Sequence, residues 1–111
     1  DMQDAALHAL IEREDRPTAI VVSDDILAVT LERFCTLRGI SIPRDLSIVS
    51  FNNSLFARLT SPRLTSIDLN SFQLGFEAAS QLVSHIEHPT LMATKSIIPH
   101  RIVERESCRD L

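Results

Sequence analysis

The sequence predicts an α/β fold, with a parallel sheet flanked by helices. Two short apolar runs that are rich in β-branched residues, 18–22 and 46–51, have the composition of buried strands. A helical pattern of apolar residues over 24–38 separates them. Strand, helix and strand form one right-handed crossover unit, so the two strands are expected to lie parallel in one sheet.

Further helices are predicted on both sides of this unit. Residues 1–14 place apolar side chains at helical spacing, and Pro17 follows the end of that pattern. Residues 54–60 are expected to form one or two helical turns, and residues 72–87 a longer helix with an apolar stripe. Gly75 interrupts this stripe and indicates a close approach to another backbone.

Two further strands complete the prediction. Residues 64–68 form a third short strand, and residues 95–103 form a strand that Pro99 interrupts, as suits the edge of a sheet. Ser71 is expected to cap the helix that follows the third strand. The last residues of the chain are polar and are expected to be frayed.

Each of the first two strands stops at a pair of polar residues. Ser23 and Asp24 follow the first strand, and Asn52 and Asn53 follow the second. In open α/β sheets ligands bind at this carboxyl edge, so Ser23, Asp24 and Asn52 are candidates to hydrogen-bond a polyol. Each has a structural alternative, because Ser23 is a good N-cap, an acidic residue suits the start of a helix, and Asn is common in turns.

Composition and charge exclude several classes of function. The 111 residues suffice for one domain, and no apolar run approaches the roughly 20 residues that cross a bilayer. The net charge is −4 and Lys95 is the only lysine, so the chain by itself is not expected to bind nucleic acid. Cys35 and Cys108 are expected to be reduced thiols of a cytoplasmic protein, and the first residues lack the pattern of a signal peptide.

No arrangement of residues indicates an enzyme, a metal site or a cofactor. The sequence lacks a nucleophile elbow and a glycine-rich phosphate loop. His85 and His88 have a spacing that could bind a metal, but no third ligand is in view and histidine is favoured at a helix end. Asp24 and Asp25 are adjacent, and adjacent residues of a helix do not face each other as an acid–base pair would.

Five segments of the sequence carry a recognisable pattern. They are residues 17–24 (PTAIVVSD), 39–53 (GISIPRDLSIVSFNN), 61–67 (SPRLTSI), 74–79 (LGFEAA) and 98–107 (IPHRIVERES). In order and spacing they resemble the C-terminal part of the LacI/GalR family of bacterial repressors, whose catabolite-control and maltose-operon members look most alike. Five segments in register over nearly the whole chain make the resemblance specific.

The resemblance implies a periplasmic-binding-protein-like (type I) fold, with two α/β subdomains around a cleft. Residues 1–68 would belong to the C-terminal subdomain, and residues 69–111 would supply a crossover helix on the N-terminal subdomain and a returning hinge strand. A DNA-reading helix-turn-helix would lie upstream. The implied function is repression of carbohydrate genes in response to a sugar such as maltose. An alternative is the sugar-binding component of a transport system.

The resemblance also assigns the cleft residues. Ser23 and Asp24 match the family's cleft edge, and Asn52 stands where the family usually has a ligand-binding aspartate. An amide both donates and accepts hydrogen bonds, whereas a carboxylate only accepts, so Asn52 still suits sugar hydroxyls.

Two segments resemble the family's dimer interface, the helix over 25–36 and the segment 55–61. The expected interface residues are Leu27, Ala28, Leu31, Leu55, Phe56 and Leu59. We therefore expect a homodimer, or an exchange of segments between copies. The helix over 71–87 is a further candidate, as a docking site for a phosphocarrier corepressor protein.

Overall fold

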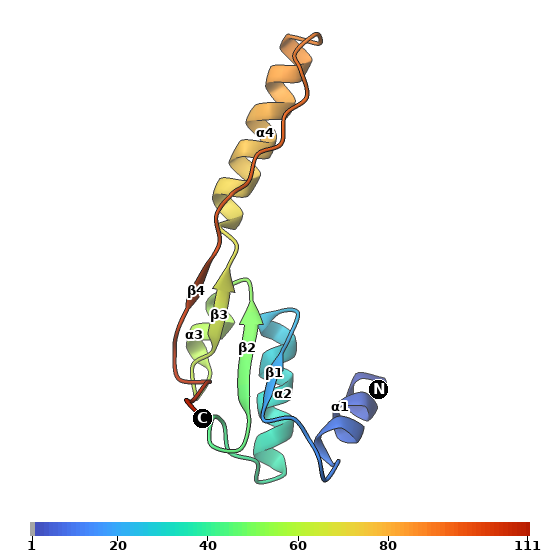
Figure 1. Cartoon of the computed structure of the whole chain (residues 1–111), viewed down its shortest axis with the longest axis vertical. Coiled ribbons are helices and arrows are strands. Elements are labelled where there is room, and N and C mark those ends of the chain that lie inside the picture. The colour runs from blue at the N-terminus through green and yellow to red at the C-terminus, as the bar shows by residue number, and fades with distance from the viewer. Residues whose placement is uncertain (1) are drawn as a thin grey trace.

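The computed structural model describes the backbone of residues 2–111 and the side chains of residues 5–111. Helices and strands alternate along the chain, as predicted (Figure 1). They are α1 (Met2–Ile11), β1 (Ala19–Val21), α2 (Asp25–Leu37), β2 (Ser47–Phe51), α3 (Leu55–Leu59), β3 (Thr65–Asp68), α4 (Ser71–Glu87) and β4 (Arg101–Val103).

The sheet has the strand order β1-β2-β3-β4. The first three strands are parallel, which confirms the predicted α/β class, and β4 runs antiparallel to β3 at the edge. The predicted strand over 95–103 is therefore confined to Arg101–Val103, and the residues before it run back alongside α4 without sheet pairing (Figure 1). Pro99 lies just before this strand, where a missing backbone N–H does no harm.

Two predicted caps are wrong by one residue. Asp24, not Ser23, caps α2, because its Oδ1 accepts the amide of Leu27 at 2.8 Å. Asn70, not Ser71, takes the cap position of α4, with a left-handed backbone and no side-chain bond to the helix. In both helices the N-cap is therefore not the serine that the residue types alone suggest, but the neighbouring Asp24 or Asn70.

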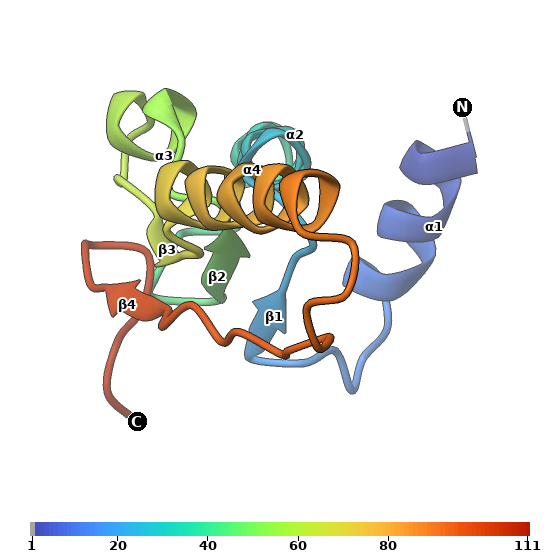
Figure 2. The same cartoon turned by 90° about the horizontal axis from the view of Figure 1, so that it is seen from above.

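The core lies between α2 and the sheet, and α2 and α3 cover the same face (Figure 2). Its members are apolar side chains from α1, α2, β2 and α3 and from residues directly beside the parallel strands. Each large one contributes roughly 1.5–3 kcal/mol by its burial. They are Ile11, Val22, Ala28, Leu31, Phe34, Cys35, Leu46, Ile48, Ala57 and Leu64.

The C-terminal segment is held in place, and the predicted fraying is wrong. Ser107 is fully buried, and its Oγ donates to the carbonyl of Ile48 at 2.5 Å and accepts the amide of Thr65 at 2.8 Å. The guanidinium of Arg109 donates to the carbonyl of Arg44 at 2.8 Å. These bonds tie the end of the chain to β2 and β3.

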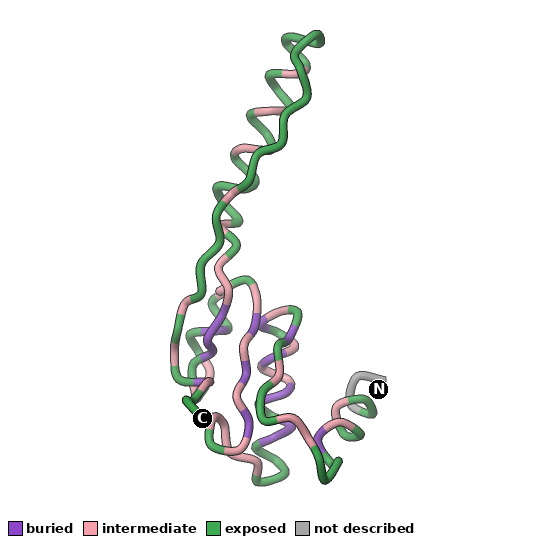
Figure 3. The backbone as a smooth tube through the Cα atoms, in the orientation of Figure 1, coloured by how far each residue is buried: buried purple, intermediate pink, exposed green. Residues whose placement is uncertain are grey.

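Helix α4 projects from this body with the segment 88–100 beside it, which gives the molecule extents of 59 × 28 × 23 Å (Figure 1). No residue of α4 is buried, whereas the buried residues gather in the body (Figure 3). Within the described residues no helix is both long and apolar enough to span a membrane. A side chain at Gly75 would meet no atom within 4 Å, so the predicted close approach to a backbone is absent from the described chain.

Candidate functional site

The candidate site is the carboxyl edge of the parallel strands. β1, β2 and β3 end at Val21, Phe51 and Asp68, and their parallel pairing places these three ends at one edge. The predicted residues Ser23 and Asn52 both follow such an end and are exposed there. The structure thus brings the predicted polar residues to the same edge of the sheet.

Asp24 is half-buried at this edge and has a structural task. Its Oδ1 is committed to the amide of Leu27, because it satisfies one of the free N–H groups at the start of α2. The cap uses one carboxylate oxygen, so the other is available as an acceptor. Asp24 can therefore serve the helix and a ligand together.

Asn52 and Asn53 have left-handed backbones, with φ of 97° and 47°. Asparagine tolerates this region better than most residues, which explains the Asn pair after β2. The amide of Asn52 donates to the carbonyl of Ile67 at 2.8 Å and so continues the β2–β3 pairing. Its side chain stays exposed at the edge, as a free donor and acceptor would.

The side chain of Asn53, in contrast, is hydrogen-bonded within the chain at both its nitrogen and its oxygen. Its Nδ2 donates to Asp68 at 3.0 Å, and its Oδ1 accepts from the guanidinium of Arg105 at 2.5 Å. Asp68 also lies 3.6 Å from Arg101, and the Asn53 hydrogen bond, ahead of this charge, lowers the pKa of the Asp68 carboxyl. Asn53 therefore joins β2, β3 and the segment after β4.

Asp25 is the residue that the sequence analysis missed. Its carboxylate is 2% exposed, and it accepts from Ser50 Oγ at 2.5 Å, Ser66 Oγ at 2.8 Å and the amide of Ser54 at 2.6 Å. Burial raises the pKa of this carboxyl, but the hydrogen bonds from the three serines outweigh it and lower the pKa overall. The sequence did contain a signal for this buried carboxylate. Ser50 and Ser66 lie within two of the predicted strands, and a buried hydroxyl needs a hydrogen-bond partner.

This carboxylate connects the edge to the helices. Ser66 Oγ accepts the amide of Asn53 at 2.9 Å and donates onward to Asp25 in the first turn of α2. The side chain of Ser54 makes no capping hydrogen bond to α3. The backbone amide of Ser54 donates to the same carboxylate. The end of β2, the start of α3 and the start of α2 therefore share one buried anion.

The predicted dimer residues divide into two groups. Leu55, Phe56 and Leu59 on α3 are exposed by 58%, 49% and 69%. Ala28 and Leu31 are fully buried in the core of their own chain, so their predicted place in an interface is wrong. Leu27 is partly buried and packs against the same core. On α2 the apolar residues Ala28, Leu31, Phe34 and Cys35 are buried in the core, whereas Ile26 and Leu37 stay exposed, and α3 presents the exposed Leu55, Phe56 and Leu59.

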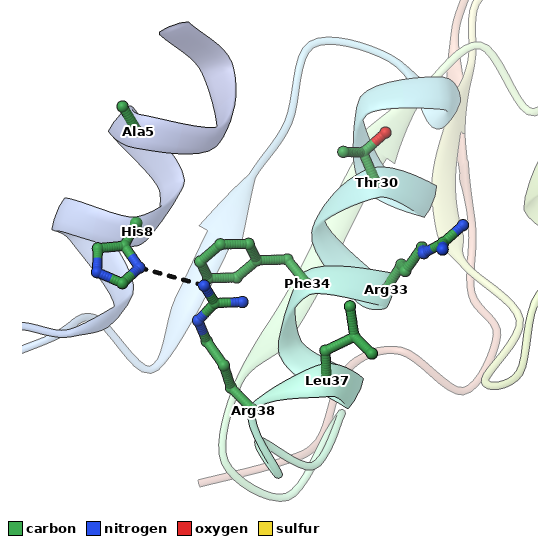
Figure 4. Close-up of a pocket in the computed structure, with 7 residues that line it drawn as sticks. All are labelled: Ala5, His8, Thr30, Arg33, Phe34, Leu37 and Arg38. Carbon is green, nitrogen blue, oxygen red and sulfur yellow. Dashed lines mark hydrogen bonds between the residues drawn. The ribbon is translucent and has the colours of Figure 1, made fainter. Parts of the chain in front are cut away.

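An open groove of about 590 Å³ lies between α1 and the C-terminal half of α2 (Figure 4). The guanidinium of Arg38 sits 3.6 Å above the ring of Phe34 and is bonded to His8 Nδ1 at 3.2 Å. This end of α2 is the one opposite to Asp24, so the groove is separate from the strand-end site. Among the described residues, no group of three or more His, Cys, Asp or Glu could hold a metal ion.

Comparisons with known proteins agree with this geometry. Residues 1–108 match the periplasmic binding protein-like domain family. Catabolite control protein A of Priestia megaterium is 31% identical over 104 residues, which cover 94% of this chain and 31% of that protein. A solved transcriptional regulator LacI from Bacillus cereus subsp. cytotoxis is 37% identical with a TM-score of 0.91, covering 96% of this chain and 38% of that one.

A LacI family transcriptional regulator from Enterococcus faecalis V583, solved with bound ribose, is 30% identical with a TM-score of 0.89. The match covers 98% of this chain and 40% of that one. The chain thus spans about a third of the length of the curated relative and about two fifths of the two solved chains. The chain belongs to the periplasmic binding protein-like domain family and, within it, is part of the effector-binding domain of the LacI family of transcriptional regulators, as its motifs predicted.

Proposed function

We propose that this chain is the effector-sensing and dimerising portion of a LacI-family transcriptional repressor of carbohydrate metabolism. One observation carries the proposal. The side chains of Ser23 and Asn52 are exposed at the carboxyl edge of a parallel sheet, beside Asp24. A relative of the same fold has ribose bound, and ligands of open α/β sheets occupy this edge.

The three side chains suit a sugar. A serine hydroxyl donates and accepts, an aspartate carboxylate accepts, and an asparagine amide does both. Sugar hydroxyls need such mixed partners, because each carries one donor and two acceptor lone pairs. Ser23, Asp24 and Asn52 are the proposed effector-binding residues, and maltose or a related sugar is the proposed ligand.

The other wall of the cleft would come from the remainder of a longer protein. Residues 1–68 would belong to the C-terminal subdomain, and α4 would pack on the N-terminal subdomain before the chain returns through β4. The exposed apolar side chains of α4 support this, with Phe72 exposed by 85%, Leu82 by 62% and Ile86 by 68%. Surfaces of this kind in natural proteins are normally covered.

Operator DNA would be read by a helix-turn-helix outside this chain, because the chain has a net charge of −4 and a single lysine. Such a repressor acts in the cytoplasm and does not catalyse a reaction. The alternative function, a sugar-binding transport component, is less favoured, because the relatives at this similarity are transcriptional regulators.

The proposed repressor is a homodimer through α3. Leu55, Phe56 and Leu59 form one exposed apolar surface, which we call the α3 patch. A second proposed partner is a phosphocarrier corepressor that docks on α4, which the similarity to catabolite control protein A favours. A pull-down of the full-length protein with the phosphorylated carrier tests this partner, and no retention would remove it.

Calorimetry of the full-length protein against a panel of sugars, ribose and maltose included, tests the effector site. The expected result is binding of one sugar that Asn52→Ala weakens at least tenfold, because a buried sugar hydroxyl loses its partner. Thr18→Ala is the matched control. It removes the hydroxyl of the residue directly before β1, at the end of the strand away from the proposed site. Unchanged binding in Asn52→Ala would remove this residue from the site, and no binding of any sugar would contradict the function.

A further inference from the structure

Glu32 on α2 is a buried acid without a partner. Its exposed fraction is 6%, and among the residues whose side chains the structure describes, none hydrogen-bonds its Oε1. Burial raises the pKa of the Glu32 carboxyl to about 7, and no opposing charge lowers it. Natural proteins almost never bury glutamate unless it is paired. We therefore expect a donor or a cation from outside the described residues to pair with Glu32.

An open hollow of about 330 Å³ lies beside Glu32. Its wall is formed by α2, the loop after α2 and the residues directly after α3, and it includes Thr36, Ser41, Ser61 and Pro62. No arginine or lysine is part of this wall. Three of these residues carry hydroxyls, which can accept the spare N–H donors of a cation that reaches the carboxylate.

The α3 patch adjoins this hollow, because Ser61 follows α3 by two residues. Arg58 belongs to the same exposed surface: it lies one turn after Leu55 and directly before Leu59. Its side chain is exposed and takes part in none of the ion pairs between described residues. Among the described residues, Arg58 thus offers an unpaired cation on an uncovered apolar surface, and Glu32 an unpaired buried anion beside a hollow whose wall includes Ser61, two residues after α3.

We propose that Glu32 is completed by Arg58 of a second copy of this chain, in a two-fold dimer that covers the α3 patch. In an isologous interface each contact occurs twice, so two copies would form two equivalent pairs. Arginine fits the role, because its planar fork can give two N–H bonds to a carboxylate and others to nearby hydroxyls. Arg33 lies in another part of the surface, where it lines the groove between α1 and α2 together with Thr30 and Leu37.

This inference rests on the homodimer of the proposed function and adds the contact that fixes its register. The test is a double-mutant cycle on the full-length protein, with the dimer dissociation constant measured by sedimentation equilibrium. The variants are Glu32→Gln, Arg58→Gln and both together. Arg58→Gln is expected to weaken the dimer at least tenfold, because it leaves two buried carboxylates unpaired. The double variant is expected to be no weaker than Arg58→Gln alone.

Arg33→Gln is the matched control, since it removes the same charge from an exposed site on α2, and it is expected to change the constant less than twofold. The pair is overturned if Arg58→Gln and Arg33→Gln have equal effects, or if the effects of Glu32→Gln and Arg58→Gln simply add. A wild-type protein that stays monomeric at all concentrations would overturn the dimer and the pair together. Sugar binding, measured separately, decides the effector function in either case.

Discussion

Ser66 donates a hydrogen bond of 2.8 Å to the carboxylate of Asp25, which joins β3 to the first turn of α2. Ser50 donates to the same oxygen from β2 at 2.5 Å. Two neighbouring strands and one helix are therefore fixed to a single buried charge, close to the edge where the effector is proposed to bind. Charge-assisted hydrogen bonds of this kind are about twice as strong as neutral ones.

Asp25→Asn is expected to lower the free energy of unfolding by about 2–4 kcal/mol, because bonds to a charged group are lost and an NH₂ group faces a donor. Urea unfolding followed by circular dichroism measures the change. Asp24→Asn is the matched control, since asparagine caps helices as well as aspartate does, and its effect should stay within about 0.5 kcal/mol. Equal losses in the two variants would contradict the special role of Asp25.

The pH dependence of unfolding should also report Asp25. The folded-state pKa of Asp25 is below its ordinary value of 3.8, so the stabilisation is present above about pH 4 and is lost as the pH falls further. The wild-type protein should therefore lose stability more steeply than Asp25→Asn does as the pH falls below about 4. Parallel curves for the two proteins in this range would count against the lowered pKa.

Glu32 should act in the opposite direction. Its pKa rises from 4.5 to about 7 on folding, so the folded state binds more protons than the unfolded state between these values, and stability falls as the pH rises through that window. The loss amounts to about 3 kcal/mol, at 1.36 kcal/mol for each unit. Glu32→Gln should remove this loss and be more stable than its parent at pH 8.

The comparison is best made in the Arg58→Gln background, because the proposed pair with a second copy would offset the loss. Urea unfolding at pH 4.5 and pH 8 gives both values. Glutamine keeps the volume and the hydrogen-bonding oxygen of glutamate, so the charge is the main change. A Glu32→Gln variant that is less stable than its parent at pH 8 would show that the buried carboxylate has a partner.

Asn53→Ala should destabilise the chain by about 1–3 kcal/mol, because the partners Asp68 and Arg105 lose a shared bond and alanine is strained at φ 47°. Asn53→Gly separates these two causes, since glycine tolerates the backbone but lacks the amide. Thermal unfolding of both variants gives the two contributions. If the wild type, Asn53→Ala and Asn53→Gly unfold at similar temperatures, the hydrogen bonds of Asn53 to Asp68 and Arg105 do not contribute to stability.

The isolated chain should associate with itself or exchange segments between copies, because the apolar face of α4 has no cover in the body. Phe72 and Phe76 stack at 6.5 Å on this exposed surface. Sedimentation velocity should show dimers or larger species at micromolar concentration, and Phe72→Ser with Phe76→Ser should reduce them. A monodisperse monomer would contradict this expectation.

Sequence reasoning located the elements but not their non-local contacts. The strands near 19–21 and 47–51 follow from β-branched apolar runs, and the polar pairs after them follow from the strand ends. The burial of Asp25 depends on serines 25 and 41 residues away, which no local pattern connects. The ordered C-terminal segment likewise depends on Ser107 reaching Ile48, 59 residues away.

The dimer assignment failed at two residues for a similar reason. Apolar residues on α2 cannot be divided by sequence into those that face the sheet and those that face a partner. Ala28 and Leu31 have exposed fractions of zero and belong to the core of their own chain. The shortness of β4 also depends on tertiary structure, since residues 88–100 accompany α4 and reach the sheet only at Arg101.

The arm formed by α4 and its returning segment is joined to the body by two connections that lie next to each other. Asp68 and Arg101 are register partners where β3 and β4 meet this arm, and the side chain of Asn70 donates to the carbonyl of Pro99 just beyond them. Sliding the arm along the strands would shear the β3–β4 hydrogen bonds, whereas rotating it about the backbone beyond them would not. We therefore expect the two adjacent connections to favour rotation of the arm over sliding, with the twist concentrated at the sheet edge where Asn53 bonds Asp68.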